Sequence, residues 1–194
     1  MSSSDSPSIA ELEQHIIILR ERLVQIAAEV KALLAEDVPK FLERELKRAF
    51  VSHPDFASTL SDSALRTLKA DIKSGGESAT RDMLAAVEDN ALWFAGAAAA
   101  DDAKKSIAEN EALWSAISDV VCGALDAIRA KYAFPAGPPS SYKPPTWFIG
   151  RRYLPSLSEK YWQLLRELHE TETQIGQTRS ESAKVDLTRR WDEV

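Results

Sequence analysis

The residues best suited to recognition lie in one proline-rich segment, residues 133–155. This segment carries six of the nine prolines in the chain and no acidic residue. The prolines predict an irregular loop without helix or central strand. Its aromatic and basic residues are Phe134, Tyr142, Trp147, Phe148, Tyr153, Lys143, Arg151 and Arg152. Long loops are uncommon in compact domains, so we expect this aromatic segment to have a binding or a structural role.

One interpretation of residues 133–155 is a recognition loop. Arg151 and Arg152 would receive a carboxylate or a phosphate, because guanidinium groups hold such anions with paired hydrogen bonds. Aromatic side chains beside these arginines would pack against the same partner. The predicted partner- or anion-binding residues are Arg151, Arg152, Lys143, Tyr142 and Tyr153.

The other interpretation is a structural wrap across a helical bundle. Trp147 and Phe148 would then anchor the segment in the core, with arginine stacked on an aromatic ring. Both interpretations can hold together, because buried anchors can position exposed arginines. We predict that Trp147 and Phe148 are largely buried, since burial of a large aromatic is favourable. We predict that Arg151 and Arg152 stay exposed or meet a carboxylate, because an unpaired buried charge is costly.

Metal and nucleophile chemistry has little support in the sequence. The three histidines, His15, His53 and His169, lie in different segments and form no spaced metal-binding motif. Cys122 is the single cysteine and lies in an apolar run, which favours a small buried side chain. Neither a P-loop nor a Gly-x-Ser-x-Gly motif is present. We therefore expect no metal site, no cofactor and no catalytic residue.

One spacing is compatible with phosphate chemistry. Arg48 and His53 are five residues apart, and some helical ribonucleases use a similar arginine–histidine pairing on a phosphate. His53 directly precedes Pro54, however, so it falls at a helix end. There it suits a C-terminal cap with a favourable helix-dipole contact.

The charge pattern argues against nucleic acid as the main partner. The net charge is −6, whereas phosphate neutralisation needs a basic face. Residues 77–126 hold ten acidic and three basic residues. Such a stretch is usually a solvated helical surface, but it could also receive the basic loop of this chain or of a second copy.

A long N-terminal helix is the clearest predicted element. Ser8 and Glu11 form a capping-box pattern at its start. An a/d seam of four heptads follows without a miss, through Ile9, Leu12, Ile16, Leu19, Leu23, Ile26, Val30 and Leu33. The apolar stripe then moves by one residue at Leu34 and continues to Phe50. Pro39 is expected to bend or break the helix near residues 36–39.

The other helices are predicted from their apolar faces and end signals. One covers residues 58–73 and ends at Gly75-Gly76, a second runs from 77 to about 99, and a third from about 102 to 132. The last helix carries Leu157, Tyr161, Leu164, Leu168, Ile175 and Val185 at heptad spacing. Thr171, Thr178 and Ser182 dilute this seam in its second half, so the end of the helix is expected to fray or project. Matching stripes at the two ends of the chain predict that residues 9–34 pack antiparallel along residues 157–185.

These elements predict an all-α fold. It is a helical bundle whose long N- and C-terminal helices pair as an antiparallel coiled coil. Residues 1–8 are expected to be a disordered tail, and residues 9–194 a single domain. No stretch approaches the ~20 apolar residues of a membrane span, and the N-terminus lacks the pattern of a secretory signal. The expected location is the cytoplasm.

The function predicted from these features is a non-catalytic protein-interaction or scaffold role, with self-association. It depends on the heptad seam, the absence of catalytic motifs and the aromatic, basic loop. The alternative is a helical enzyme or small-ligand binder that acts on an anionic ligand, a phosphate or a carboxylate, near residues 133–155.

Overall fold

The computed structural model describes residues 7–98, 103–149 and 157–192, and this part of the chain contains helices and no strand. The all-α prediction is therefore confirmed. The helices are α1 (Ile9–Ser52), α2 (Pro54–Thr59), α3 (Asp62–Ala98), α4 (Ala103–Lys131), α5 (Thr146–Ile149) and α6 (Leu157–Asp192). The predicted capping box is present, because Ser8 and Glu11 exchange hydrogen bonds at the start of α1. Residues 1–6 of the predicted tail lie outside the described residues.

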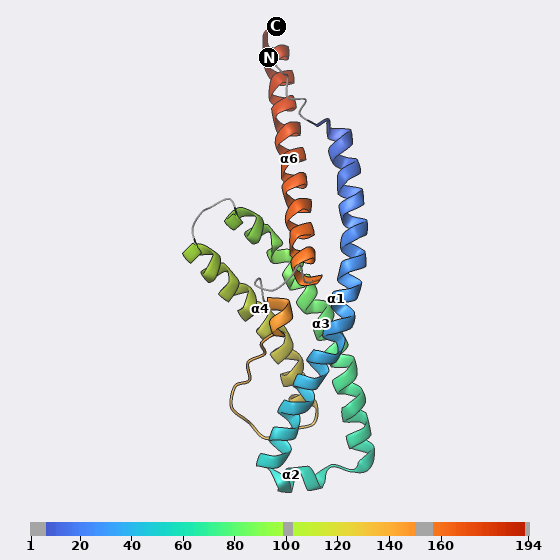
Figure 1. Ribbon diagram of the computed structural model, residues 1–194. Coiled ribbons are helices and arrows are strands. Elements are labelled where there is room, and N and C mark those ends of the chain that lie inside the picture. The colour runs from blue at the N-terminus through green and yellow to red at the C-terminus, as the bar shows by residue number, and fades with distance from the viewer. Residues whose placement is uncertain (1–6, 99–102, 150–156, 193–194) are drawn as a thin grey trace.

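The long terminal helices α1 and α6 lie side by side and run in opposite directions (Figure 1). An ion pair of 2.9 Å between Arg20 and Glu172 joins their surfaces. The fully buried or nearly buried side chains of this pair include Leu12, Leu19 and Val30 from α1 and Tyr161, Leu165 and Ile175 from α6. The predicted antiparallel pairing is confirmed, and so is the shift of the stripe, since Leu33 is exposed and Leu34 is buried.

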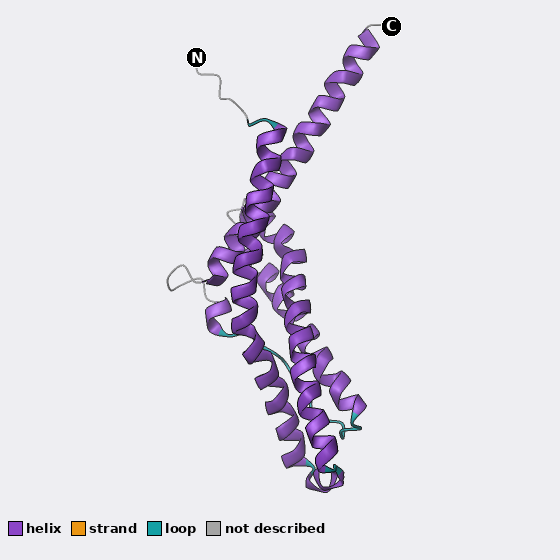
Figure 2. Cartoon of the chain, turned by 90° about the vertical axis from the view of Figure 1, so that its right-hand side faces the viewer, coloured by secondary structure: helices purple, strands orange, loops and turns teal. Residues whose placement is uncertain are grey.

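The pairing ends before α6 does. From residue 176 to residue 186 the side chains of α6 are exposed, apart from the half-buried Thr178. Figure 2 shows this C-terminal part projecting away from α1. The expectation that this end projects is confirmed, whereas the prediction that the packing along α1 extends to Val185 is wrong, because the Val185 side chain is 68% exposed. Thr178 and Ser182 interrupt the apolar stripe, so little apolar area remains to hold this end against α1.

The helix break predicted at Gly75-Gly76 is absent, and of the bend or break predicted at Pro39 α1 shows a bend without a break. α1 continues through Pro39 to Ser52, and its axis changes direction along its length (Figure 1). α3 is continuous through Gly75-Gly76, so the two helices predicted over 58–73 and 77–99 are one. Both helices continue because Pro39 and Gly76 lie in close contact with each other. A Cβ atom on Gly76 would lie 2.5 Å from Cγ of Pro39, so the glycine allows α3 to approach the proline ring.

α3, α4 and the second half of α1 share one core with residues of the proline-rich segment. α4 buries the face predicted for it, with Leu113, Ile117, Val121 and Leu125 almost inaccessible to solvent. The prediction that residues 133–155 contain no helix is wrong over four residues, because Pro145 directly precedes the single turn α5. No helix in the described part of the chain is long and apolar enough to cross a membrane.

Candidate anion-binding groove

The main anchor of the proline-rich segment in the core is the side chain of Phe148. Phe148 is 1% exposed, and its ring packs against Trp114 and Trp162 at centroid distances of 6.4 Å and 6.1 Å. Trp147 is half-buried and meets the edge of Phe148. The predicted burial of Phe148 is confirmed, while Trp147 is less buried than predicted.

Tyr142 is a second anchor. Its hydroxyl donates a 2.6 Å hydrogen bond to Oδ2 of Asp37, and its ring meets Phe41 edge-on at 5.1 Å. Burial, followed by the hydrogen bond to Asp37, raises the pKa of the Tyr142 hydroxyl well above its ordinary value. Tyr142 was predicted as a partner-binding residue, but the structure places it in the core.

The other predicted site residues are not gathered around Tyr142. Lys143 is exposed on the same segment. Arg151, Arg152 and Tyr153 lie outside the described residues, so their role stays a prediction. The structure instead brings together a different set of basic residues at the start of the segment.

The first residues of the segment form a sharp turn after α4. Ala133 adopts a left-handed conformation with φ of 52°, and the backbone N–H of Phe134 donates to the carbonyl of Arg129 at 2.9 Å. This is the hydrogen-bond pattern of a helix C-terminal cap. The ring of Phe134 then packs against both Phe50 and Phe56. The turn therefore directs the following prolines back along the C-terminal half of α1.

A groove of about 770 Å³ lies between the C-terminal half of α1, the end of α4 and residues 135–139. Its lining includes two carboxylates, Glu43 and Glu45, and His53 at the end of α1. Five cationic side chains also line it: Lys40, Arg44, Lys47, Arg48 and Arg129. The groove is thus locally basic in a chain whose net charge is −6.

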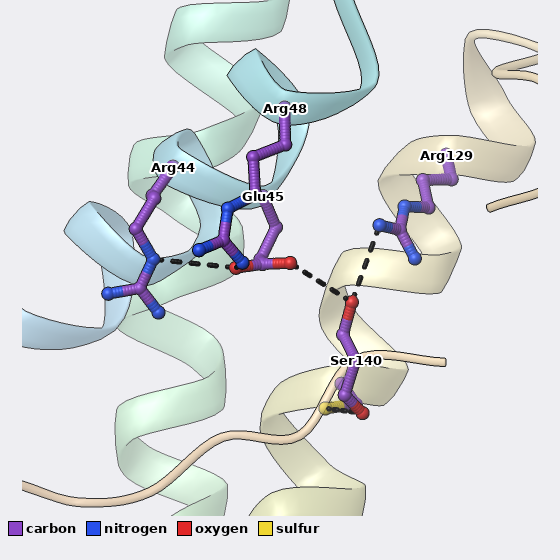
Figure 3. A network of polar contacts seen from close by, with 6 residues as sticks. Arg44, Glu45, Arg48, Arg129 and Ser140 are labelled. Carbon is purple, nitrogen blue, oxygen red and sulfur yellow. Dashed lines mark hydrogen bonds and ion pairs between the residues drawn. The ribbon is translucent and has the colours of Figure 1, made fainter. Parts of the chain in front are cut away.

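Glu45 is the centre of a polar network at the base of this groove (Figure 3). The residue is 9% exposed. Its Oε1 accepts a 2.9 Å hydrogen bond from Arg48 and lies 3.4 Å from Nε of Arg44. Its Oε2 accepts from the Ser140 hydroxyl at 3.3 Å, and that hydroxyl accepts from Arg129 at 3.4 Å. One buried carboxylate therefore contacts the guanidinium groups of Arg44 and Arg48 directly and is linked to that of Arg129 through the Ser140 hydroxyl.

The arginines differ in how firmly they are held. The side chain of Arg129 is 17% exposed, and that of Arg48 is 70% exposed. Arg44 also lies over the ring of Phe41, with 5.3 Å between the guanidinium carbon and the ring centroid. A guanidinium has five N–H donors, so each arginine keeps donors beyond its contact in this network. The lysines are more accessible, because the side chains of Lys40 and Lys47 are each 71% exposed and pair with Glu36 and Glu43 of their own helix.

Cys122 on α4 holds the backbone of the proline-rich segment at Ser140, next to the groove. Its thiol donates to the backbone carbonyl of Ser140 at 3.2 Å, and the residue is half-buried. The Ser140 backbone is thus tied to α4 while its hydroxyl points toward Glu45 on α1. Among the residues that the structure describes, no three His, Cys, Asp or Glu side chains converge as a metal site.

No family model, no curated protein and no solved structure matches this chain.

Sequence reasoning missed most of this groove. A signal for half of it was present, because Lys40, Arg44, Lys47 and Arg48 recur at helical spacing on one face of α1. Nothing in the sequence indicated that Arg129, 81 positions after Arg48, would meet the same face through Ser140. The Arg48–His53 spacing was noticed, and both residues do line the groove.

Proposed function

We propose that this chain is a non-catalytic interaction protein that holds an anionic group of its partner in the basic groove. The observation that carries the proposal is the excess of five cationic side chains over two carboxylates in the groove of an acidic protein. Charged groups arranged in this way steer a partner of opposite charge and fix how it docks.

The arrangement of Arg129 strengthens the proposal. Its side chain is largely buried, so an anion that reaches it is partly removed from water. Hydrogen bonds between a guanidinium and a carboxylate or phosphate are stronger in such surroundings than in bulk solvent. The more exposed Arg44 and Arg48 would supply further donors on the opposite side of the groove.

The test measures binding of three anionic probes by calorimetry at low salt: pyrophosphate, poly-L-glutamate and oligothymidylate. We expect at least one probe to bind. The Lys40→Glu and Lys47→Glu double variant should bind it at least tenfold more weakly, since two attractive charges become repulsive. Both lysines are exposed and lie apart from Glu45, so the fold should be retained. Arg81→Gln, an exposed arginine on α3 outside the groove, is the matched control. Absence of binding to every probe, or equal binding by the double variant, refutes the proposal.

A second candidate function, a helical enzyme or small-ligand binder for an anionic compound, is favoured by one observation. Arg48 and His53 line the same groove, so a phosphate held by the arginine could lie near an imidazole that exchanges protons. Hydrolysis of a nitrophenyl phosphodiester that His53→Ala abolishes would support this candidate. Binding without turnover in the same assay supports the interaction role.

The interaction role also includes self-association. α6 fills the heptad seam of α1 within one chain, so that seam is not free for a second copy. Ile17 and Val24 are seven residues apart on α1 and are 51% and 70% exposed. Light scattering over a concentration range should show dimer that the Ile17→Lys and Val24→Lys double variant weakens. A monomeric mass for the unmodified chain at high micromolar concentration would remove self-association from the proposal.

A further inference from the structure

We infer that the groove binds an extended acidic polypeptide segment, with acidic side chains at alternate positions. The inference rests on the proposed function, because it names the chemical class of the partner at that same groove. Three properties of the groove carry it: the spacing of its cations, the chemistry of its proline wall and the absence of Phe, Tyr and Trp from the described residues that line it.

The cations on α1 form three rows. Lys40, Arg44 and the pair Lys47 and Arg48 follow one another at three or four residues, so they share one helix face. With a rise of 1.5 Å per residue, successive rows lie about 6 Å apart and the set spans about 12 Å. In an extended chain, side chains two residues apart point the same way and lie about 6.7 Å apart. Acidic residues at alternate positions therefore match the three rows over about five residues.

The wall opposite these cations is apolar and rigid. It is made of Pro135, Gly137, Pro138 and Pro139, and prolines supply no backbone N–H group. Such a wall cannot pair with a peptide backbone as a full strand would, but it can contact aliphatic side chains. In an extended ligand, the residues between the acidic ones point away from α1 and toward this wall. An alternation of acidic and aliphatic residues fits both sides.

The same lining disfavours nucleic acid and single phosphates. Proteins that bind single-stranded nucleic acid stack the bases mainly on large aromatic side chains, and among the described residues no Phe, Tyr or Trp lines this groove. An isolated phosphate would occupy one row and leave the other cations unused. Carboxylates placed about 6.7 Å apart use all three rows.

The test compares two fluorescent peptides of identical composition and charge by anisotropy at low salt. One alternates glutamate and valine over seven residues, and the other has its four glutamates together followed by three valines. The alternating peptide should bind about threefold more tightly, because the block peptide reaches two of the three rows and loses about one exposed charge contact. Lys40→Gln with Lys47→Gln should weaken the alternating peptide and bring the two affinities together. Arg81→Gln should leave both affinities unchanged.

The outcomes separate this inference from the proposed function. Equal affinity for the two peptides, or tighter binding of an oligothymidylate of the same charge, overturns the acidic-segment inference and leaves an anion-binding groove. Failure of the peptides, the oligothymidylate and pyrophosphate alike overturns the proposed function and the inference with it. A rise in salt should weaken the alternating peptide, since exposed charge contacts are screened over about 10 Å at 0.1 M.

Discussion

Replacement of Glu45 with glutamine should lower stability and increase affinity for an acidic peptide at the same time. Glu45 accepts hydrogen bonds from Arg48 and Ser140 and lies beside Arg44, so it neutralises part of the charge that a ligand would meet. Glutamine keeps the size of the side chain and one acceptor oxygen but removes the charge. The arginines would then attract an acidic ligand more strongly, while the folded protein loses the charge contacts that the Glu45 carboxylate provides.

The change in stability follows from the contacts of Glu45, and the change in affinity follows from Coulomb's law for a ligand charge placed about 6 Å away. A hydrogen bond to a charged group contributes about 1.5–3 kcal/mol, and the exposed Arg48 regains part of this from water, so we expect a loss of about 1–2 kcal/mol in the free energy of unfolding. For binding, a unit charge about 6 Å from the ligand at an effective dielectric constant of about 40 contributes about 1.4 kcal/mol. That difference is about tenfold in affinity.

Urea unfolding and peptide anisotropy measure the two effects on the same samples. Glu43→Gln is the matched control, because Glu43 also lines the groove but its side chain is 47% exposed and its ion-pair partner is Lys47. At an effective dielectric constant near 80, this control should tighten binding about threefold and change stability little. If Glu45→Gln instead weakens peptide binding, Glu45 holds the arginines in place for the ligand, and the reasoning from charge is refuted.

Three further predictions concern the fold that positions the groove. Gly76→Ala should destabilise by about 1–2 kcal/mol in urea unfolding, because its Cβ would meet the Pro39 ring, whereas Gly176→Ala has open space and should stabilise by about 0.5–1 kcal/mol. A Gly76→Ala variant as stable as the Gly176→Ala variant would contradict the close contact. Ala133→Gly should raise the unfolding free energy by about 0.5–1 kcal/mol, since glycine adopts a left-handed conformation without strain, and an unchanged or lower value would contradict this. The raised pKa of Tyr142 means that the folded state binds its phenolic proton more tightly than the unfolded state. Its contribution is complete below about pH 10 and is lost as the pH rises further, so alkaline titration of stability should be less steep in Tyr142→Phe.

The parts of the fold that the sequence predicted correctly depend on local patterns, namely heptad spacing and the residues that begin and end helices. The heptad spacing from Ile9 to Val30 predicts a helix and its buried stripe, because side chains three and four residues apart share one face whatever lies opposite. The same reasoning located α4, the start of α1 at Ser8 and the end of α1 at His53. The a/d stripe of the last helix also predicted its partner, since two stripes of similar length at the ends of one chain cover each other.

Contacts between distant residues decided the rest. Pro39 and Gly76 each weaken a helix when judged alone, but they lie against each other across two helices, and the packing of that contact outweighs both local preferences. The groove depends in the same way on Ser140, which joins Glu45 and Arg129 over 95 and 11 residues of sequence. Hydrogen bonds across such separations leave no periodic pattern, because they depend on how whole helices and one proline-rich segment pack in space.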